Sequence, residues 1–301
     1  MYRRGRDPTD NQYSLQIYKC KFVQNHAKSD GGAIFISING ETSPHRPINI
    51  YDNIFISNKA EEKDNQSGTS KEEEEEHGGA IYYSFASSGT IAQGSKSLRV
   101  NKCRFEENKV SHEGGCLYIS ITKDQPTNSI EITECHFYNN KAENSVESSQ
   151  GEASLGSGSD IYYNFESTDT SSSSAGTNDE ASLLVYKCYF SGSEAISEGG
   201  NIRISILKGE PLKSIEIKNC TFKGNKASKG GSISYNYESN PQQGTINDNI
   251  YALHITDCKF NSNTATVKGS SIFLSISSNA PNNAIKIAKN RWLNILINKK
   301  P

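Results

Sequence analysis

The chain has 301 residues, with 32 basic and 34 acidic side chains and a formal net charge of −2. This balance excludes the strong basic excess by which proteins bind nucleic acids or anionic membranes. Only 34% of the residues are hydrophobic, which favours a thin, elongated core over a globular domain. No apolar run approaches the roughly 20 residues that span a bilayer. Residues 1–12 are expected to form an N-terminal extension without the apolar stretch of a secretory signal.

One pattern of spaced residues recurs seven times along the chain and defines three columns. The phenylalanine column comprises Phe22, Phe55, Phe105, Phe137, Phe190, Phe222 and Phe260. Two residues before each phenylalanine, the cysteine column comprises Cys20, Cys103, Cys135, Cys188, Cys220 and Cys258, with Asn53 in the second copy. Three residues after it, the asparagine column comprises Asn25, Asn58, Asn108, Asn140, Asn225 and Asn263, with Ser193 in the fifth copy. An aliphatic pair precedes these columns and a small-residue pair such as Gly31-Gly32 follows them.

Within each copy, apolar and polar residues alternate, as in Ile130-Glu131-Ile132. A period of two buries one face of a β-strand and leaves the other in water. We therefore expect three short strands per coil, with equal columns stacked at the roughly 4.8 Å spacing of parallel strands. The crossover rule makes the winding right-handed. The sequence predicts an all-β, right-handed, single-stranded parallel β-helix (a solenoid) of about seven coils plus a partial eighth.

The third expected strand alternates between two kinds of side chain. In its middle position, aliphatic residues alternate with tyrosines along the chain, in the order Ile36, Tyr83, Ile119, Tyr163, Ile204, Tyr235 and Leu274. Alternating bulk lets successive layers of a narrow core interdigitate. The sequence therefore predicts a structural unit of two coils.

We expect a single β-helix domain over residues 13–292 and a C-terminal tail at 293–301. Loop insertions are expected at three polar segments, residues 61–77, 143–157 and 167–181. The first two share a position in the coil and are expected to emerge along one edge of the rod. An eighth copy begins with Ile285 and reaches Trp292 in the phenylalanine place, but no glycine pair completes it. The chain is therefore expected to be a segment of a longer array.

The tandem pairing of Gly-Gly-Ala-Ile with Phe-x-x-Asn resembles the repeats of chlamydial-type polymorphic outer membrane proteins, and similar arrays occur in large surface proteins of trichomonad protists. The resemblance covers essentially residues 15–292. It implies a pectin-lyase-like right-handed β-helix on the cell surface or in secreted form, often assigned to adhesion to host cells.

The cysteine and asparagine columns are the most prominent candidates for chemistry. Stacked cysteines could form disulfides, or a row of thiols could bind a soft metal. No CxxC pair or accompanying histidine supports either reading, so we expect free, buried thiols that pack as small hydrophobic groups, and no metal or cofactor. The asparagines are expected to be structural, since asparagine tolerates left-handed backbone and stacked amides can hydrogen-bond along the rod. The glycine pairs are expected to meet a positive φ or a close backbone approach.

Many β-helices are polysaccharide lyases or hydrolases, so catalysis is an alternative function for this fold. That chemistry needs paired carboxylates, or carboxylates with Ca²⁺ and a base, on neighbouring coils. The acids expected to point outward, Glu131, Glu216 and Asp160, lie on single coils without such neighbours. The acidic run 72–76 could bind Ca²⁺ or a basic partner, but is expected to be a solvated loop. No catalytic residue is predicted.

We therefore expect a non-catalytic, adhesin-like β-helix segment whose outward strand faces and loops bind a protein or glycan of a host or neighbouring cell. A carbohydrate-binding or polysaccharide-cleaving β-helix is one alternative, and an intracellular repeat scaffold is another. No nucleic-acid partner and no membrane-spanning segment is expected. The resemblance favours the cell surface or a secreted form as the location.

Overall fold

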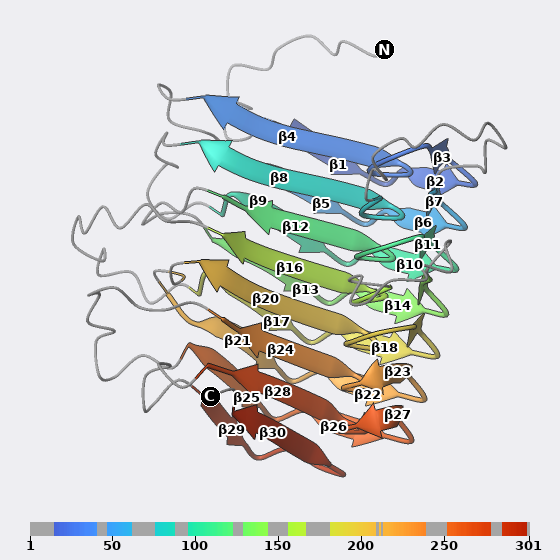
Figure 1. The fold of residues 1–301 in the computed structure, drawn as a ribbon. Helices are drawn as coiled ribbons and strands as arrows, with labels where there is room; N and C mark the ends of the chain where they lie inside the picture. The colour runs from blue at the N-terminus through green and yellow to red at the C-terminus, as the bar shows by residue number, and fades with distance from the viewer. Residues whose placement is uncertain are drawn as a thin grey trace, which may run out of the picture.

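The computed structural model describes residues 15–40, 47–61, 76–87, 96–122, 129–143, 156–166, 181–208, 211, 213–238, 252–277 and 285–299. In these residues every regular element is a β-strand, and every strand pairs in parallel with its equivalent one coil away. The coils stack along one axis, as the successive arrows of Figure 1 show. Four sheets, here named A to D, run the length of the rod.

Sheets A and B carry the first half of each coil. Sheet A contains the aliphatic pairs in β1 (Leu15–Tyr18), β5 (Ile48–Tyr51), β9 (Leu98–Asn101), β13 (Ile130–Thr133), β17 (Leu183–Tyr186), β21 (Ile215–Lys218), β25 (Leu253–Thr256) and β29 (Ile285–Ala288). Sheet B contains the phenylalanine column in β2 (Lys21–Val23), β6 (Ile54–Ile56), β10 (Arg104–Glu106), β14 (His136–Tyr138), β18 (Tyr189–Ser191), β22 (Thr221–Lys223) and β26 (Lys259–Asn261).

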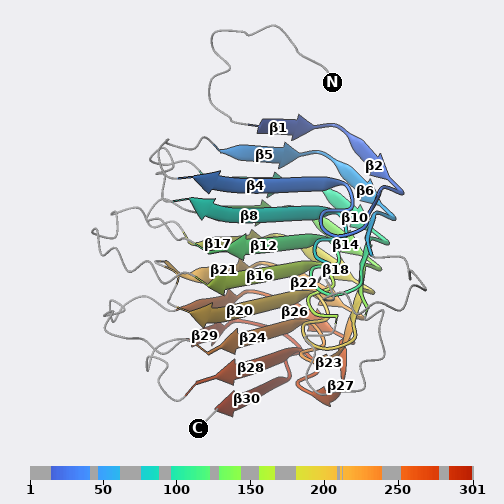
Figure 2. The same ribbon diagram turned by 45° about the horizontal axis from the view of Figure 1, so that its top comes forward.

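Sheets C and D complete the coil. Sheet C comprises β3 (His26–Ala27), β7 (Lys59–Ala60), β11 (Lys109–Val110), β15 (Lys141–Ala142), β19 (Glu194–Ala195), β23 (Lys226–Lys229) and β27 (Thr264–Lys268). Sheet D comprises β4 (Ile34–Gly40), β8 (Ile81–Ser87), β12 (Leu117–Ile121), β16 (Ile161–Glu166), β20 (Ile202–Lys208), β24 (Ile233–Tyr237), β28 (Ile272–Ile276) and β30 (Ile295–Lys299). Its strands are the long front arrows of Figure 2.

This arrangement confirms the predicted parallel β-helix of about seven coils plus a partial eighth. The expectation of three strands per coil is wrong, because each full coil has a fourth in sheet C. Several strands of sheet C are only two residues long, such as Lys59–Ala60. A two-residue strand is too short for an alternating pattern to show in the sequence.

The core is built from stacked columns that face the axis. Successive phenylalanine rings lie 4.8–4.9 Å apart with interplanar angles of 2–8°. In sheet D, Tyr83 pairs in register with Ile36 of the preceding coil and Ile119 of the following coil, and both Tyr83 and Ile119 are fully buried. The alternation of aliphatic and tyrosine layers expected from the sequence is therefore present in the core.

The C-terminal boundary expected from the sequence is corrected by the structure. Residues 293–301 do not form a tail throughout, since β30 pairs with β28 from Ile272↔Ile295 onward. Only two residues separate Trp292 from β30, so the eighth coil reaches sheet D directly and needs no glycine pair. Trp292 itself does not extend the phenylalanine stack: it has a φ of 56° and is 67% exposed.

The expected N-terminal extension, residues 1–12, lies outside the described residues, as do 62–75, 144–155 and 167–180 within the expected insertions. The described flanks place the first two insertions between sheets C and D, and the third between sheets D and A. None of the described residues forms a helix long and apolar enough to cross a membrane.

Candidate functional site

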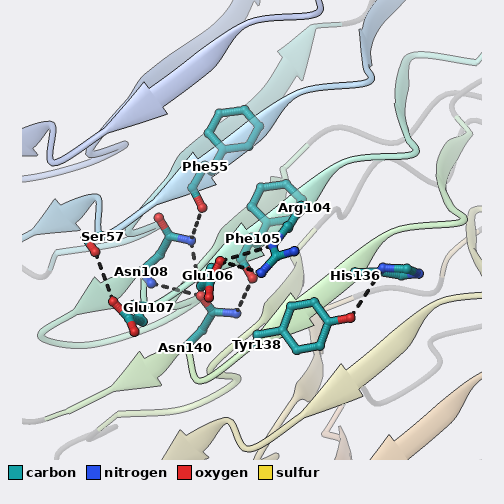
Figure 3. Close-up of polar contacts among 10 residues, drawn as sticks. All are labelled: Phe55, Ser57, Arg104, Phe105, Glu106, Glu107, Asn108, His136, Tyr138 and Asn140. Carbon is teal, nitrogen blue, oxygen red and sulfur yellow. Dashed lines mark hydrogen bonds and ion pairs between the residues drawn. The ribbon is translucent and has the colours of Figure 1, made fainter.

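The asparagine column forms a buried ladder of amides along the rod. The side chain of Asn108 donates through Nδ2 to Asn140 Oδ1 at 3.1 Å and to the Phe55 carbonyl oxygen at 3.1 Å (Figure 3). The backbone N–H of Asn108 also donates to Asn140 Oδ1, at 2.9 Å. Asn25, Asn58 and Asn225 make the corresponding bonds to the next amide, at 2.8–2.9 Å between side chains. The amides of Asn58, Asn108 and Asn225 thus each join three coils and satisfy turn groups that the core removes from water.

The left-handed backbone lies one residue before the asparagines, contrary to expectation. Gln24, Ser57, Glu107, Asn139 and Ser262 have φ values of 52–54°. The asparagines themselves are needed for their amides and not for their backbone freedom. This position is exposed or half-buried and accepts several residue types, so it left no column in the sequence.

The glycine pairs meet both expected requirements, one in each residue. Gly31 and its equivalents take a positive φ, and a Cβ on the second glycine would collide with backbone carbonyl oxygens. At Gly115 these belong to Ser159 of the next coil and Lys141. The pair therefore permits the tight entry into sheet D.

The cysteine column forms a second ladder, in which a thiol replaces an amide. Cys135 Sγ donates to the carbonyl oxygen of Val100 on the preceding coil at 3.5 Å and to that of Thr133 at 3.3 Å. In the second coil Asn53 Nδ2 makes the same bond to the preceding coil, with the Ile17 carbonyl oxygen at 2.9 Å. This shared bond explains why asparagine and cysteine exchange at one position.

All seven cysteines are free thiols. Five column members, Cys103, Cys135, Cys188, Cys220 and Cys258, are buried on consecutive coils. The expectation of burial is wrong for Cys20, which is exposed in the first coil, although its Sγ donates to the Tyr18 carbonyl oxygen as the other column members do to the residue two before them. Among the described residues, no group of three or more histidine, cysteine or acidic side chains could hold a metal ion.

Asp160 was expected to point outward, but it is fully buried next to the asparagine ladder. Asn140 Nδ2 and Ser193 Oγ donate to its Oδ1 at 2.8 and 2.9 Å, and Asn201 Nδ2 donates to its Oδ2 at 2.7 Å. Burial raises the pKa of Asp160 to about 7, against the opposing effect of these hydrogen bonds. The carboxyl group fills the ladder where serine replaces asparagine at position 193. Its role is therefore structural.

A partly buried cluster of histidines and acids between sheets C and D was missed from the sequence. His77 Nδ1 lies 3.1 Å from Asp30 Oδ1, and His77 Nε2 lies 3.8 Å from Glu113 Oε2. His112 Nδ1 lies 2.5 Å from Glu76 Oε2. Glu76 is 3% exposed, so the last residue of the acidic run is not solvated as expected. The sequence feature that could have revealed this cluster is a polar residue directly before each Gly-Gly or Gly-Ser pair. These residues are Asp30, His77, Glu113, Ser157, Glu198, Lys229 and Lys268.

The outward acids of sheet A do not form a catalytic pair. Glu131 Oε2 lies 3.7 Å from Arg99 Nε, and Glu216 Oε2 lies 2.6 Å from Lys218 Nζ. The coil between them presents Leu184 at the same register. Each carboxylate is thus partnered by a cation and separated from the other by a full coil.

The outer face of sheet B presents an aromatic cluster, hereafter the aromatic platform, formed by Arg104, His136, Tyr138 and Tyr189. The Arg104 guanidinium lies 5.1 Å from the ring centroid of Tyr138, and its Nη2 lies 2.8 Å from Glu106 Oε2. The rings of Tyr138 and Tyr189 are 5.8 Å apart, and His136 lies about equally far from both, at 6.0 and 6.1 Å. Arg104 and His136 are exposed and the tyrosines half-buried, so the cluster is open to solvent. Figure 3 shows three of its members, Arg104, His136 and Tyr138.

Residues 19–37 match the family model described as the Chlamydia polymorphic membrane protein (Chlamydia_PMP) repeat. No curated protein and no solved structure matches the chain. The matched segment contains the first copy of all three columns and of the glycine pair, and the later copies pair with it in register. The chain thus carries the Chlamydia polymorphic membrane protein repeat at residues 19–37, and the stack of parallel strands around it agrees with the resemblance read from the sequence.

Proposed function

We propose that the chain is a non-catalytic interaction module of a surface-associated repeat protein, and that it binds a protein or glycan through the outer face of sheet B. The aromatic platform is the observation that carries this proposal. Tyrosine and arginine are enriched at the centres of protein interfaces, where their planar groups bury much area with little loss of entropy. A rigid sheet holds these groups in place before binding, which lowers the entropic cost further.

The matched repeat supports a location at the cell surface, because the family is described as a repeat of a membrane protein. The partner in this proposal is therefore a protein or glycan of a host or neighbouring cell. The flat sheet suits an extended ligand, because its outward side chains repeat once per coil along the rod (Figure 1).

The acids of sheet A and those beside the histidines do not form the pair that polysaccharide cleavage needs. Cleavage needs two accessible carboxylates that can reach one glycosidic bond. Glu131 and Glu216 are held apart on sheet A. Glu76 and Glu113 are 3% and 5% exposed and lie against histidines. Neither pair presents an accessible acid beside a base at a surface where a sugar chain would lie.

The test is binding of the purified chain to an array of glycans and cell-surface proteins, together with an activity screen on the same polysaccharides. The double variant Tyr138→Ala/Tyr189→Ala should lose at least about tenfold in affinity for any ligand found, as expected for truncating central aromatic contacts. The matched control is Tyr51→Ala/Tyr186→Ala, which removes two half-buried tyrosines from sheet A. Equal loss in both variants, or turnover of any polysaccharide, would refute the proposal.

A further inference from the structure

The outer face of sheet B becomes cationic toward its C-terminal end. Lys259 pairs in register with Thr221 on one side and forms a parallel bridge with Arg291 on the other. Lys223 lies on the same face of β22, two residues after Thr221. Lys223, Lys259 and Arg291 are all exposed, and none of the three has an ion pair with another described residue. Like charges on adjacent strands, roughly 4.8 Å apart, repel one another.

The adjacent sheet shows how this chain neutralises a row of lysines internally. Lys59, Lys109 and Lys141 are stacked in register on sheet C. Glu143 lies between two of them, with Oε2 2.6 Å from Lys109 Nζ and Oε1 3.3 Å from Lys141 Nζ. Glu61 lies between Lys59 and Lys109, 3.5 Å from Lys59 Nζ and 3.9 Å from Lys109 Nζ, so the two acids share Lys109. The sheet B cations lack such interleaved acids, although the chain as a whole carries a net charge of −2.

We infer that the outer face of sheet B binds a linear sulfated polysaccharide laid along the rod axis. Its sulfate groups would contact Lys223, Lys259 and Arg291, and its sugar rings would lie against Tyr138 and Tyr189. Arginine and lysine form charge-assisted hydrogen bonds with such oxyanions. This inference rests on the proposed function and names the chemistry of its ligand.

The order of residues along one row supports a repeating, extended anion. The outward position before each phenylalanine reads Lys21, Ile54, Arg104, His136, Tyr189, Thr221 and Lys259 on consecutive coils, and Arg291 bridges to Lys259 on the eighth. From His136 onward, a polymer along the axis would therefore meet aromatic rings first and cations next, at one strand spacing per step. Three unpaired cations on a chain of negative net charge fit a sulfated glycan better than nucleic acid, whose binding depends on many phosphate contacts.

The experiment measures the affinity of a size-defined heparin oligosaccharide for the full chain by titration calorimetry at two salt concentrations. Lys259→Glu should weaken binding by about tenfold or more. It should also make the fall of the log association constant with log salt concentration shallower, by about one unit of slope or more. The matched control is Lys21→Glu, the same charge change at the other end of the same row. It should change affinity less than about twofold. Circular dichroism melting of both variants checks that the fold is retained.

Equal losses in the two variants, equal binding of fully desulfated heparin, or stronger binding of single-stranded DNA would overturn the inference. A second measurement needs no variant: heparin should protect Lys223 and Lys259 of the unmodified chain from acetylation and leave Lys21 reactive. Failure of this inference is separable from failure of the proposed function. A neutral glycan or protein that binds through Tyr138 and Tyr189, without heparin binding, would retain the proposed function alone.

Discussion

Replacing the buried Asp160 with asparagine should change how the stability of the rod depends on pH. The carboxyl group is fully buried, and burial raises its pKa from the ordinary value of 3.8 to about 7. The folded state therefore binds the proton more tightly than the unfolded state. Such a group stabilises the folded state fully at a pH below the pKa that it has in the unfolded chain. This stabilisation is lost as the pH rises through the pKa that it has in the folded protein.

The magnitude follows from the two pKa values. A difference of about three pKa units corresponds to about 4 kcal/mol in full, of which about 3 kcal/mol falls between about pH 5 and pH 8. Asp160→Asn has no proton to lose, and Asn201 can reverse its amide to accept from the new NH₂ group because its Oδ1 has no other partner. The free energy of unfolding of the wild type, minus that of the variant, should therefore fall by about 3 kcal/mol over this range.

Urea unfolding followed by circular dichroism at about pH 5 and pH 8 measures this difference. Subtracting the variant removes the contributions of the other acids and histidines, which are the same in both proteins. Ser193→Ala, which removes one donor to the carboxylate, provides a second perturbation and should raise the pKa further. A difference that stays constant with pH would refute the assignment of Asp160 as a buried carboxyl with a raised pKa.

Three further perturbations test the ladders and turns. Asn108→Ala should destabilise the rod by about 2–3 kcal/mol in urea unfolding, because it leaves groups on two neighbouring coils unpaired, whereas the exposed Asn261→Ala should cost little. Gly115→Ala should abolish cooperative thermal unfolding, whereas Gly224→Ala, with nothing near its added Cβ, should cost only about 1 kcal/mol. A thiol reagent should label only Cys20 in the native chain and all seven cysteines after denaturation, as counted by mass spectrometry; a second native label would contradict the buried ladder.

The repeat made most of the fold predictable from the sequence. A residue that must face the axis on every coil, such as Phe105, leaves a column that needs no structure to be seen. The regular spacing of these columns was sufficient to predict the parallel strands and the stacking of the coils. The cysteine and asparagine columns were visible for the same reason, although their hydrogen bonds were not.

The remaining features depend on neighbours that vary from coil to coil. Asp160 shares its position with Ala80, Cys116 and Asn201 on other coils, so alternation alone did not show that its carboxyl is buried. The aromatic platform was missed because outward positions repeat no residue type along the rod. β30 was missed because the eighth coil omits the glycine pair that marked the earlier entries into sheet D.

The central claim is that the outer face of sheet B is the binding surface of this rod. Hydroxyl-radical footprinting of the full chain, with and without the tightest ligand on the array, tests it most directly. The account predicts that the ligand protects Tyr138 and Tyr189 on sheet B and leaves Tyr51 and Tyr186 on sheet A equally reactive in both states. Protection of the sheet A tyrosines, with Tyr138 and Tyr189 unchanged, would contradict it.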